Sequence, residues 1–181
     1  MKTNSYKKWS VALIALTLFT NVIPLSAEPS NVLSHSVIVR ETYAAKEYKT
    51  LPKDCESITH NDLSYHLSKG RYYVEIEDGC RLVNPSVGVN IKKLPKGSVT
   101  VSSPNQKYYC CRGVVYKDAT GGGYETTLPE VGLTLPELPE AGVSEILIDG
   151  KLHYEASGMV YKEFADGEQY VVICTLESLG L

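Results

Sequence analysis

A repeat of 43 to 44 residues organises most of this 181-residue chain. Leu-Pro pairs open three units at Leu51, Leu94 and Leu138. Each unit then carries a glycine, a tyrosine three residues later and a second glycine nine residues after the first. These residues are Gly70, Tyr73 and Gly79; Gly113, Tyr116 and Gly122; and Gly158, Tyr161 and Gly167. The first two units close with a Pro-x-x-Gly motif, at Pro85–Gly88 and Pro129–Gly132. Self-similarity at a fixed period of this length is the signature of a repeat architecture.

The repeat predicts the domain organisation. We expect three repeats at residues 51–93, 94–137 and 138–181, which together form one structural domain. Residues 28–50 precede the repeats and are predicted to be a linker or to contain an extra strand. Within them, the segment Ser36-Val-Ile-Val39 is interpreted as a strand that pairs with an exposed sheet edge, or as a partner segment.

Each repeat is predicted to be a meander of about four short antiparallel strands. A glycine-containing pair marks one turn of each meander, because two-residue hairpin turns need positive φ. Counting outward from these turns places an aromatic ring or an imidazole opposite a tyrosine, a pairing that stabilises a sheet by roughly 0.2–1 kcal/mol. The turns are Lys69-Gly70, Arg112-Gly113 and Ser157-Gly158, and the opposed pairs are His66 and Tyr73, Tyr109 and Tyr116, and Tyr154 and Tyr161. Earlier turns are predicted at Asn61-Asp62, Pro104-Asn105 and Asp149-Gly150. In the third repeat the strands are expected at about 143–148, 151–156, 159–164 and 168–174.

The composition favours the same all-β fold class. The chain has 13 tyrosines and two phenylalanines, and its tyrosine, valine and threonine favour strands, while glycine and proline mark turns. Helical periodicity is absent from the repeats. We therefore expect tandem antiparallel β-meander repeats packed into a compact β domain.

The first 27 residues are predicted to be a secretory signal peptide. Lys2, Lys7 and Lys8 form a basic start, an apolar run follows, and Leu25-Ser26-Ala27 offers a cleavage site. An uncleaved anchor is the alternative, but polar residues and Pro24 break the apolar run. We therefore expect an exported protein, periplasmic or extracellular, without a transmembrane segment after cleavage.

The charge argues against nucleic-acid binding. All 21 acidic residues follow the predicted leader, whereas three of the 18 basic residues lie within it. A nucleic-acid-binding surface needs clustered basic residues, and none is found here.

Five cysteines follow the predicted leader, and an oxidising compartment would favour disulfides between them. The candidates are Cys55, Cys80, Cys110, Cys111 and Cys174. Cys55 and Cys80 lie in the same repeat and are the first pair to consider. An odd number leaves one thiol over, for intermolecular linkage, for redox chemistry or, as we favour, as a small buried hydrophobe. Cys110 and Cys111 are adjacent on a predicted strand and should point to opposite faces of its sheet.

Catalytic and metal sites have little support in the sequence. Cys110 or Cys111 with His153 could form a nucleophile and base, but only the residue types suggest it. Cys55, His60 and His66 could supply metal ligands, although their spacing fits no standard site. We expect no catalytic residues, no metal and no cofactor.

The tyrosines are the feature with most functional promise. Tyr109 and Tyr116 share one face of a predicted hairpin, and Tyr154 and Tyr161 share the equivalent face of the next repeat. If that face points outward, it forms a tyrosine ladder suited to glycans or peptides. If it points inward, it is the core, and we favour the core because phenylalanine is scarce.

The motifs resemble a family of secreted bacterial proteins of unknown function that carry tandem tyrosine-rich units. The matching segments are Leu94-Pro95-Lys96-Gly97, Tyr108-Tyr109, Gly113-Val114-Val115-Tyr116, Gly123-Tyr124, Pro129-Glu-Val-Gly132, Asp149-Gly150-Lys-Leu-His-Tyr154 and Gly158-Met-Val-Tyr161. The match covers roughly residues 94–174, and the first repeat is a weaker copy. The chain departs from the pattern at Cys110-Cys111, where the family more often has tyrosine or a polar residue. The resemblance implies a secreted, repeated, β-rich protein and brings no catalytic residues with it.

These observations favour a non-catalytic structural or binding module of the bacterial cell envelope, because repeat β folds without a convergent polar cluster usually serve interaction. The expected partner is a glycan or a protein of the envelope. The alternatives are a thiol-dependent redox protein or enzyme that uses Cys110 or Cys111, and a metal-binding envelope protein.

Overall fold

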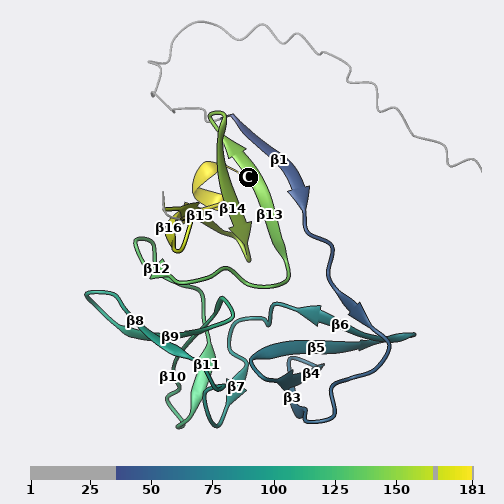
Figure 1. Cartoon of the computed structure of the whole chain (residues 1–181). Helices are drawn as coiled ribbons and strands as arrows, with labels where there is room; N and C mark the ends of the chain where they lie inside the picture. The colour runs from purple at the N-terminus through teal and green to yellow at the C-terminus, as the bar shows by residue number, and fades with distance from the viewer. Residues whose placement is uncertain (1–35, 165–166, 181) are drawn as a thin grey trace, which may run out of the picture. The chain divides into compact units, whose positions relative to one another are not determined.

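The computed structural model describes residues 36–164 and 167–180 (Figure 1). These residues form antiparallel strands and one short 3-10 helix, η1 (Glu177–Leu179). The prediction of an all-β fold is therefore confirmed. The predicted leader, residues 1–27, falls outside the described residues.

The strands form three separate sheets, each built around the meander of one repeat (Figure 1). The first sheet contains β2 (Glu47–Tyr48), β3 (Glu56–His60), β4 (Leu63–Ser68), β5 (Arg71–Ile76) and β6 (Gly79–Val83). The second contains β7 (Asn90–Ile91), β8 (Val99–Ser102), β9 (Lys107–Cys111), β10 (Val114–Asp118) and β11 (Tyr124–Thr126). The third contains β1 (Val37–Thr42), β12 (Thr134–Leu135), β13 (Val143–Ile148), β14 (Lys151–Ala156), β15 (Met159–Glu163) and β16 (Tyr170–Thr175).

All three sheets share one plan. Each is the predicted four-stranded meander, extended by a short strand that precedes the meander and pairs with its last strand. The Pro-x-x-Gly motifs deliver the second and third of these short strands. Gly88 N–H donates to the Thr126 carbonyl at 2.8 Å, and Gly132 N–H donates to the Val172 carbonyl at 2.8 Å. The connector after each of the first two sheets thus completes the next sheet along the chain.

The predicted hairpin register is confirmed in every repeat. His66 faces Tyr73, Tyr109 faces Tyr116, and Tyr154 faces Tyr161. Both residues of each connecting turn have positive φ, as in Arg112 at 52° and Gly113 at 72°. This is the geometry of a type I′ turn, whose twist matches that of the flanking strands.

Two of the three earlier turns are also two-residue hairpins, since His60 faces Leu63 and Ile148 faces Lys151. The prediction at Pro104-Asn105 is too short, because Ser102 faces Lys107 across a four-residue loop. Proline cannot adopt the positive φ that a type I′ turn requires. The loop is closed instead by Ser103, whose N–H donates to the Gln106 carbonyl at 3.0 Å and whose Oγ accepts from the Gln106 N–H at 3.0 Å.

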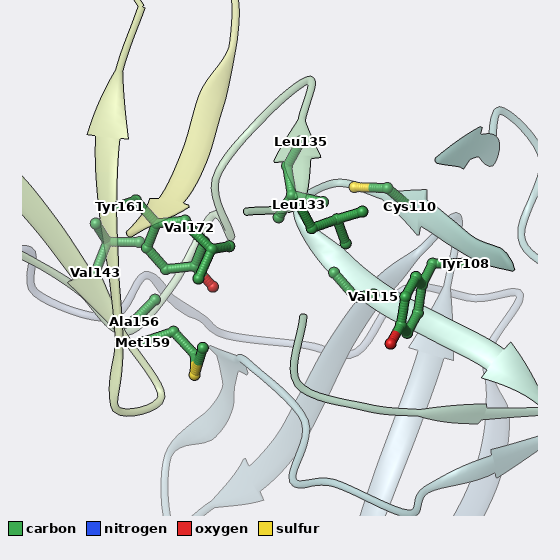
Figure 2. Close-up of a cluster of buried hydrophobic side chains, with 10 residues drawn as sticks. All are labelled: Tyr108, Cys110, Val115, Leu133, Leu135, Val143, Ala156, Met159, Tyr161 and Val172. Atoms are coloured by element: carbon green, nitrogen blue, oxygen red, sulfur yellow. The ribbon is translucent and has the colours of Figure 1, made fainter. Parts of the chain in front are cut away.

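The second sheet is buried on both faces. Successive residues of a strand point to opposite faces, so Cys110 and Cys111 enter different cores, as predicted. One core lies between the second and third sheets and contains Tyr108, Cys110, Val115, Leu133, Leu135, Val143, Ala156, Met159, Tyr161 and Val172 (Figure 2). The other lies between the first and second sheets and contains Tyr65, Leu67, Tyr72, Val89, Ile91, Cys111, Val114 and Tyr116. These two cores follow the sequential stacking of a repeat protein. The first sheet also contacts the third repeat, because Tyr73, Cys80 and Leu82 pack against Ala141.

The recurring glycine and Leu-Pro pair contact each other across repeats. A Cβ atom built on Gly70 would lie 3.4 Å from the Pro95 side chain and 2.7 Å from Cys111 Sγ. A Cβ on Gly113 would collide with the backbone of Leu138 and Pro139. The turn of one repeat thus packs against the Leu-Pro pair that opens the next, which explains why both motifs recur with the same period.

The prediction that residues 36–39 pair with a sheet edge is confirmed. Strand β1 lies antiparallel to β13, with a bulge between Val39 and Glu41 (Figure 1). Val37 also packs against a small core on the far side of the third sheet, formed by Ile146, Ile148 and Val160. Leu176 and Leu179 of the segment that ends in η1 cover the same core. The outer face of the third sheet is therefore capped by residues outside the predicted meander.

Candidate functional site

The four tyrosines of the predicted binding face separate into two classes. Tyr116 and Tyr161 are buried, with 0% and 3% of their surface exposed, and belong to the two inter-sheet cores. Tyr109 and Tyr154 are half-buried and pack at the margins of these cores. An outward ladder of all four rings is therefore not present, and only Tyr109 and Tyr154 offer surface to a ligand.

Tyr109 forms a compact group with two residues from neighbouring strands. Its ring meets Tyr124 edge to face, with the ring centroids 5.2 Å apart and the planes at 83°. Its hydroxyl donates to Asp118 Oδ1 at 3.4 Å. We call Tyr109, Tyr124 and Asp118 the second-sheet cluster.

Tyr154 forms the equivalent group in the third sheet. Its ring meets Tyr170 edge to face, with the centroids 5.6 Å apart and the planes at 85°. The hydroxyl groups of Tyr154 and Tyr170 donate to the two carboxylate oxygens of Glu163, at 3.3 and 3.5 Å. We call Tyr154, Tyr170 and Glu163 the third-sheet cluster.

The two clusters occupy matching positions because the repeats share a register. Asp118 follows Tyr116 by two residues and Glu163 follows Tyr161 by two, so each carboxylate points to the same face as that tyrosine. The second ring of each cluster comes from the last meander strand, β11 or β16. Sequence reasoning missed Tyr124, Tyr170 and both carboxylates. Two sequence features could have indicated them. An acidic residue follows the recurring tyrosine by two positions in both repeats, and a tyrosine begins the last strand of each meander.

The surroundings of the two clusters differ. In the second sheet, Lys107 Nζ lies 4.8 Å from the centroid of the Tyr109 ring, a cation–π contact. The equivalent position in the third sheet is Leu152, which is 41% exposed. Burial raises the pKa of Tyr154 and Tyr170, and the neighbouring Glu163 carboxylate raises both further. The phenols of the third-sheet cluster therefore stay protonated, which lets them donate to Glu163.

At the equivalent positions the first sheet has no tyrosine pair, although its rings meet edge to face elsewhere, in Tyr48 with Tyr73 and in Tyr65 with Tyr72. His66 and Glu75 take the positions of Tyr109 and Asp118, with His66 Nε2 at 3.8 Å from Glu75 Oε1. Cys80 faces Glu75 as Tyr124 faces Asp118, so it takes the position of Tyr124, and it is fully buried. The cluster is thus a property of the second and third repeats, which are also the repeats with the strongest tyrosine motifs.

All five cysteines are free thiols, so the predicted disulfides, including Cys55 with Cys80, are not formed in the structure. The Cys55 thiol instead donates to the Pro52 carbonyl at 2.9 Å. Cys110 and Cys111 cannot pair with each other easily because they enter different cores. Burial raises the pKa of Cys110 to about 12 and also raises that of Cys111. Both residues therefore disfavour the thiolate that nucleophilic chemistry needs.

The histidines considered as ligands or bases have other polar partners. His60 Nε2 lies 3.1 Å from Asn61 Nδ2, and His66 Nδ1 lies 3.2 Å from Ser57 Oγ. His153 is buried, with Nδ1 at 2.9 Å from the Lys151 carbonyl. Within residues 36–164 and 167–180, no group of three or more His, Cys, Asp or Glu side chains is arranged to hold a metal ion.

A search of the described part of the chain for helices long and apolar enough to span a membrane finds none.

Comparison with known proteins identifies the family of the chain. No curated protein and no solved structure matches the chain significantly. A family model matches residues 42–176, which contain all three sheets except most of β1, and the chain therefore belongs to this family of unknown function, DUF6515.

Proposed function

We propose that this chain is an exported, non-catalytic binding module of the bacterial envelope, and that its ligand is a glycan held by the second-sheet and third-sheet clusters. The observation that carries the proposal is the repetition of one arrangement, two half-buried tyrosines and a carboxylate, at equivalent positions of two sheets. The basic start and apolar run of the first 27 residues support export.

The chemistry of each cluster suits a sugar. An edge-to-face pair uses one face of one ring, so other ring surface is left for the apolar C–H face of a pyranose. An ionised carboxylate has about four acceptor positions, and the tyrosine hydroxyls occupy only some of them. Sugar hydroxyl groups can donate to the remainder. A largely apolar surface with a few fixed polar groups is the usual composition of a small-ligand site.

Two sites in one chain favour a polymeric ligand. A polysaccharide with repeating units can contact both clusters at once, so the second contact becomes intramolecular. Linking two weak sites in this way raises the overall affinity by roughly 10²–10⁴-fold where the geometry allows both to engage. A repeat protein with equivalent sites in successive repeats is therefore suited to an extended envelope polymer.

The thiol-based alternative has less support. A catalytic or redox-active cysteine requires an accessible thiolate, whereas Cys110 and Cys111 are 1% and 4% exposed and have raised pKa values. The metal-binding alternative rested on Cys55, His60 and His66, each of which has a different local hydrogen-bond partner.

The test is binding to purified peptidoglycan and to soluble chito-oligosaccharides, measured by sedimentation and by calorimetry. We expect Tyr109→Ala and Tyr154→Ala each to weaken binding about tenfold, in line with the loss of one aromatic contact, and the double variant to abolish the retention of the polymer. Tyr48→Ala is the matched control, because Tyr48 is a 40% exposed tyrosine of the first sheet outside both clusters. Equal binding by the double variant and the wild type would rule out the clusters as the site.

A further inference from the structure

Strand β1 (Val37–Thr42) is an addition to the repeat plan. The outermost meander strands of the first two sheets, β3 and β8, end their sheets, and no strand in the described part of the chain pairs with their outer edges. The equivalent strand of the third sheet, β13, is covered by β1. Apart from Thr42, β1 also lies outside the residues that match the family. The edge of β13 is thus an acceptor for a strand that the repeats themselves do not supply.

The contacts of β1 are mostly backbone contacts. It pairs with β13 over five residue pairs interrupted by one bulge. Only Val37 is packed against a core, whereas Ile38 and Val39 are 59% and 62% exposed. At its end, Thr42 Oγ1 lies 3.1 Å from Ser144 Oγ. Because a strand edge offers its hydrogen bonds to any extended backbone, this attachment can be made by the same strand from another molecule.

The segment after β1 has the character of a hinge. Residues 43–46 lead from β1 in the third sheet to β2 in the first, and all four are exposed (Figure 1). Tyr43 N–H donates to the Val143 carbonyl at 3.0 Å, and the Lys46 carbonyl accepts from Leu82 N–H at 2.9 Å, so the connection between the two attachments is Ala44 and Ala45. A short exposed connection between a peripheral strand and the rest of a domain is the arrangement that allows exchange between copies. Rotation of this segment would carry β1 away without disturbing either inter-sheet core, since no residue of β1 belongs to them.

We propose that β1 is an exchangeable strand, and that two copies of the chain form a dimer in which β1 of each copy completes the third sheet of the other. The exchange would preserve the register seen here and add a second contact. Ile38, Leu147 and Leu152 form a row across β1, β13 and β14. Ile38 and Leu152 are 59% and 41% exposed, and a second copy would cover this apolar row.

The experiment uses two differently tagged chains, one with Ile38→Cys and the other with Leu147→Cys, in a background where Cys55 and Cys174 are serine. Ile38 and Leu147 are direct partners in the ladder, so oxidation of the mixture joins the two tags only when β1 of one copy lies on β13 of another. Leu152→Cys replaces Leu147→Cys in the matched control, because Leu152 lies one strand further from β1. Light scattering over a range of protein concentrations gives the mass of the unoxidised chain.

We expect Ile38→Cys to form a disulfide dimer that carries both tags with Leu147→Cys, and to form little of this dimer with Leu152→Cys. We also expect light scattering to give the mass of a dimer for the intact chain and the mass of a monomer when residues 36–42 are deleted. A single chain that carries both Ile38→Cys and Leu147→Cys tests for pairing of β1 and β13 within one molecule. If that chain closes an internal disulfide while the mixture of single variants gives none, β1 pairs only within its own molecule and the proposal is wrong. A dimer that persists without residues 36–42 would also overturn it.

Discussion

The phenolic oxygens of Tyr72 and Tyr116 lie 3.2 Å apart in the buried interface between the first and second sheets, with the Tyr116 hydroxyl donating to that of Tyr72. Both rings are almost fully buried, at 1% and 0% exposed. Burial raises the pKa of Tyr72 to about 12 and raises that of Tyr116 as well. Both phenols therefore stay neutral, and this pair is a polar contact inside an otherwise apolar junction.

Removing one hydroxyl of this pair should cost more than removing both. Tyr116→Phe leaves the Tyr72 hydroxyl buried without this partner, which we expect to lower the free energy of unfolding by about 1–3 kcal/mol. The double variant Tyr72→Phe/Tyr116→Phe removes both polar groups and should be close to the wild type. Urea unfolding of the wild type, both single variants and the double variant measures this coupling. Strictly additive losses would show that the hydroxyl groups do not interact.

Two matched glycine variants can measure how much the contact between a turn glycine and the next Leu-Pro pair contributes to stability. Gly113 and Gly158 both have positive φ, at 72° and 79°, so alanine at either costs roughly 1–2 kcal/mol of backbone strain. Only Gly113 lacks space for a Cβ, because the backbone of Leu138 and Pro139 fills it, whereas Gly158 has no atom within 4 Å.

We therefore expect Gly113→Ala to destabilise the protein by at least about 2 kcal/mol more than Gly158→Ala, a difference typical of overpacking. Thermal and urea unfolding of the two variants give the comparison. Equal losses would mean that the turn conformation, and not the contact between repeats, explains the recurring glycine.

Glu140 links all three repeats and should make stability depend on pH. Its carboxylate accepts from Arg71 Nε at 2.6 Å and from Arg112 Nη1 at 2.6 Å, which holds its pKa below the ordinary value of 4.5. Since the pKa is lower in the folded state, this carboxylate stabilises the protein above pH 4.5, and the contribution is lost as the pH falls through the folded value.

Glu140→Gln should therefore lower the free energy of unfolding by about 1 kcal/mol at pH 7, the upper range for partly exposed ion pairs. The difference between variant and wild type should shrink as the pH falls below 4.5. Glu125→Gln is the control variant, because Glu125 forms an ion pair with Lys117 at 3.0 Å within the second sheet and does not link repeats. A Glu140→Gln effect that stays constant from pH 7 to pH 3 would contradict this account.

Sequence reasoning succeeded where local chemistry decides the structure. The turns at Lys69-Gly70, Arg112-Gly113 and Ser157-Gly158 require positive φ, and once they are placed, counting fixes the cross-strand partners of the two strands that flank each turn. The alternation of side chains likewise placed Cys110 and Cys111 on opposite faces. These features depend on a few neighbouring residues, and the sequence contains all of them.

It failed where the structure depends on contacts between repeats. The short strands β7 and β12 have two residues each, too few for a periodic pattern, and pair with strands more than thirty residues away. Gly113 likewise contacts Leu138 and Pro139, which follow it by 25 and 26 residues, and no residue near Gly113 in the sequence reveals this contact. The tyrosine clusters were missed in part, because the Tyr109 and Tyr124 rings come from strands β9 and β11 and meet across the intervening strand β10 only after the meander folds. The burial of Tyr116 and Tyr161 was expected from the scarcity of phenylalanine, but the sheets that cover the two rings could not be predicted from a single repeat.

The adjacent cysteines of β9, Cys110 and Cys111, should react far more slowly with alkylating reagents than exposed thiols do. Burial raises the pKa of Cys110 from 9.0 to about 12, which lowers its thiolate fraction at neutral pH by about a thousandfold. We expect iodoacetamide to modify Cys110 at least a hundredfold more slowly in the folded chain than in urea, as followed by mass spectrometry at pH 7.5. Cys174, which is only half-buried, is the internal control and should be modified first. Rapid modification of Cys110 in the folded chain at low temperature would mean that the inter-sheet core opens readily, and the thiol-based alternative would then regain support.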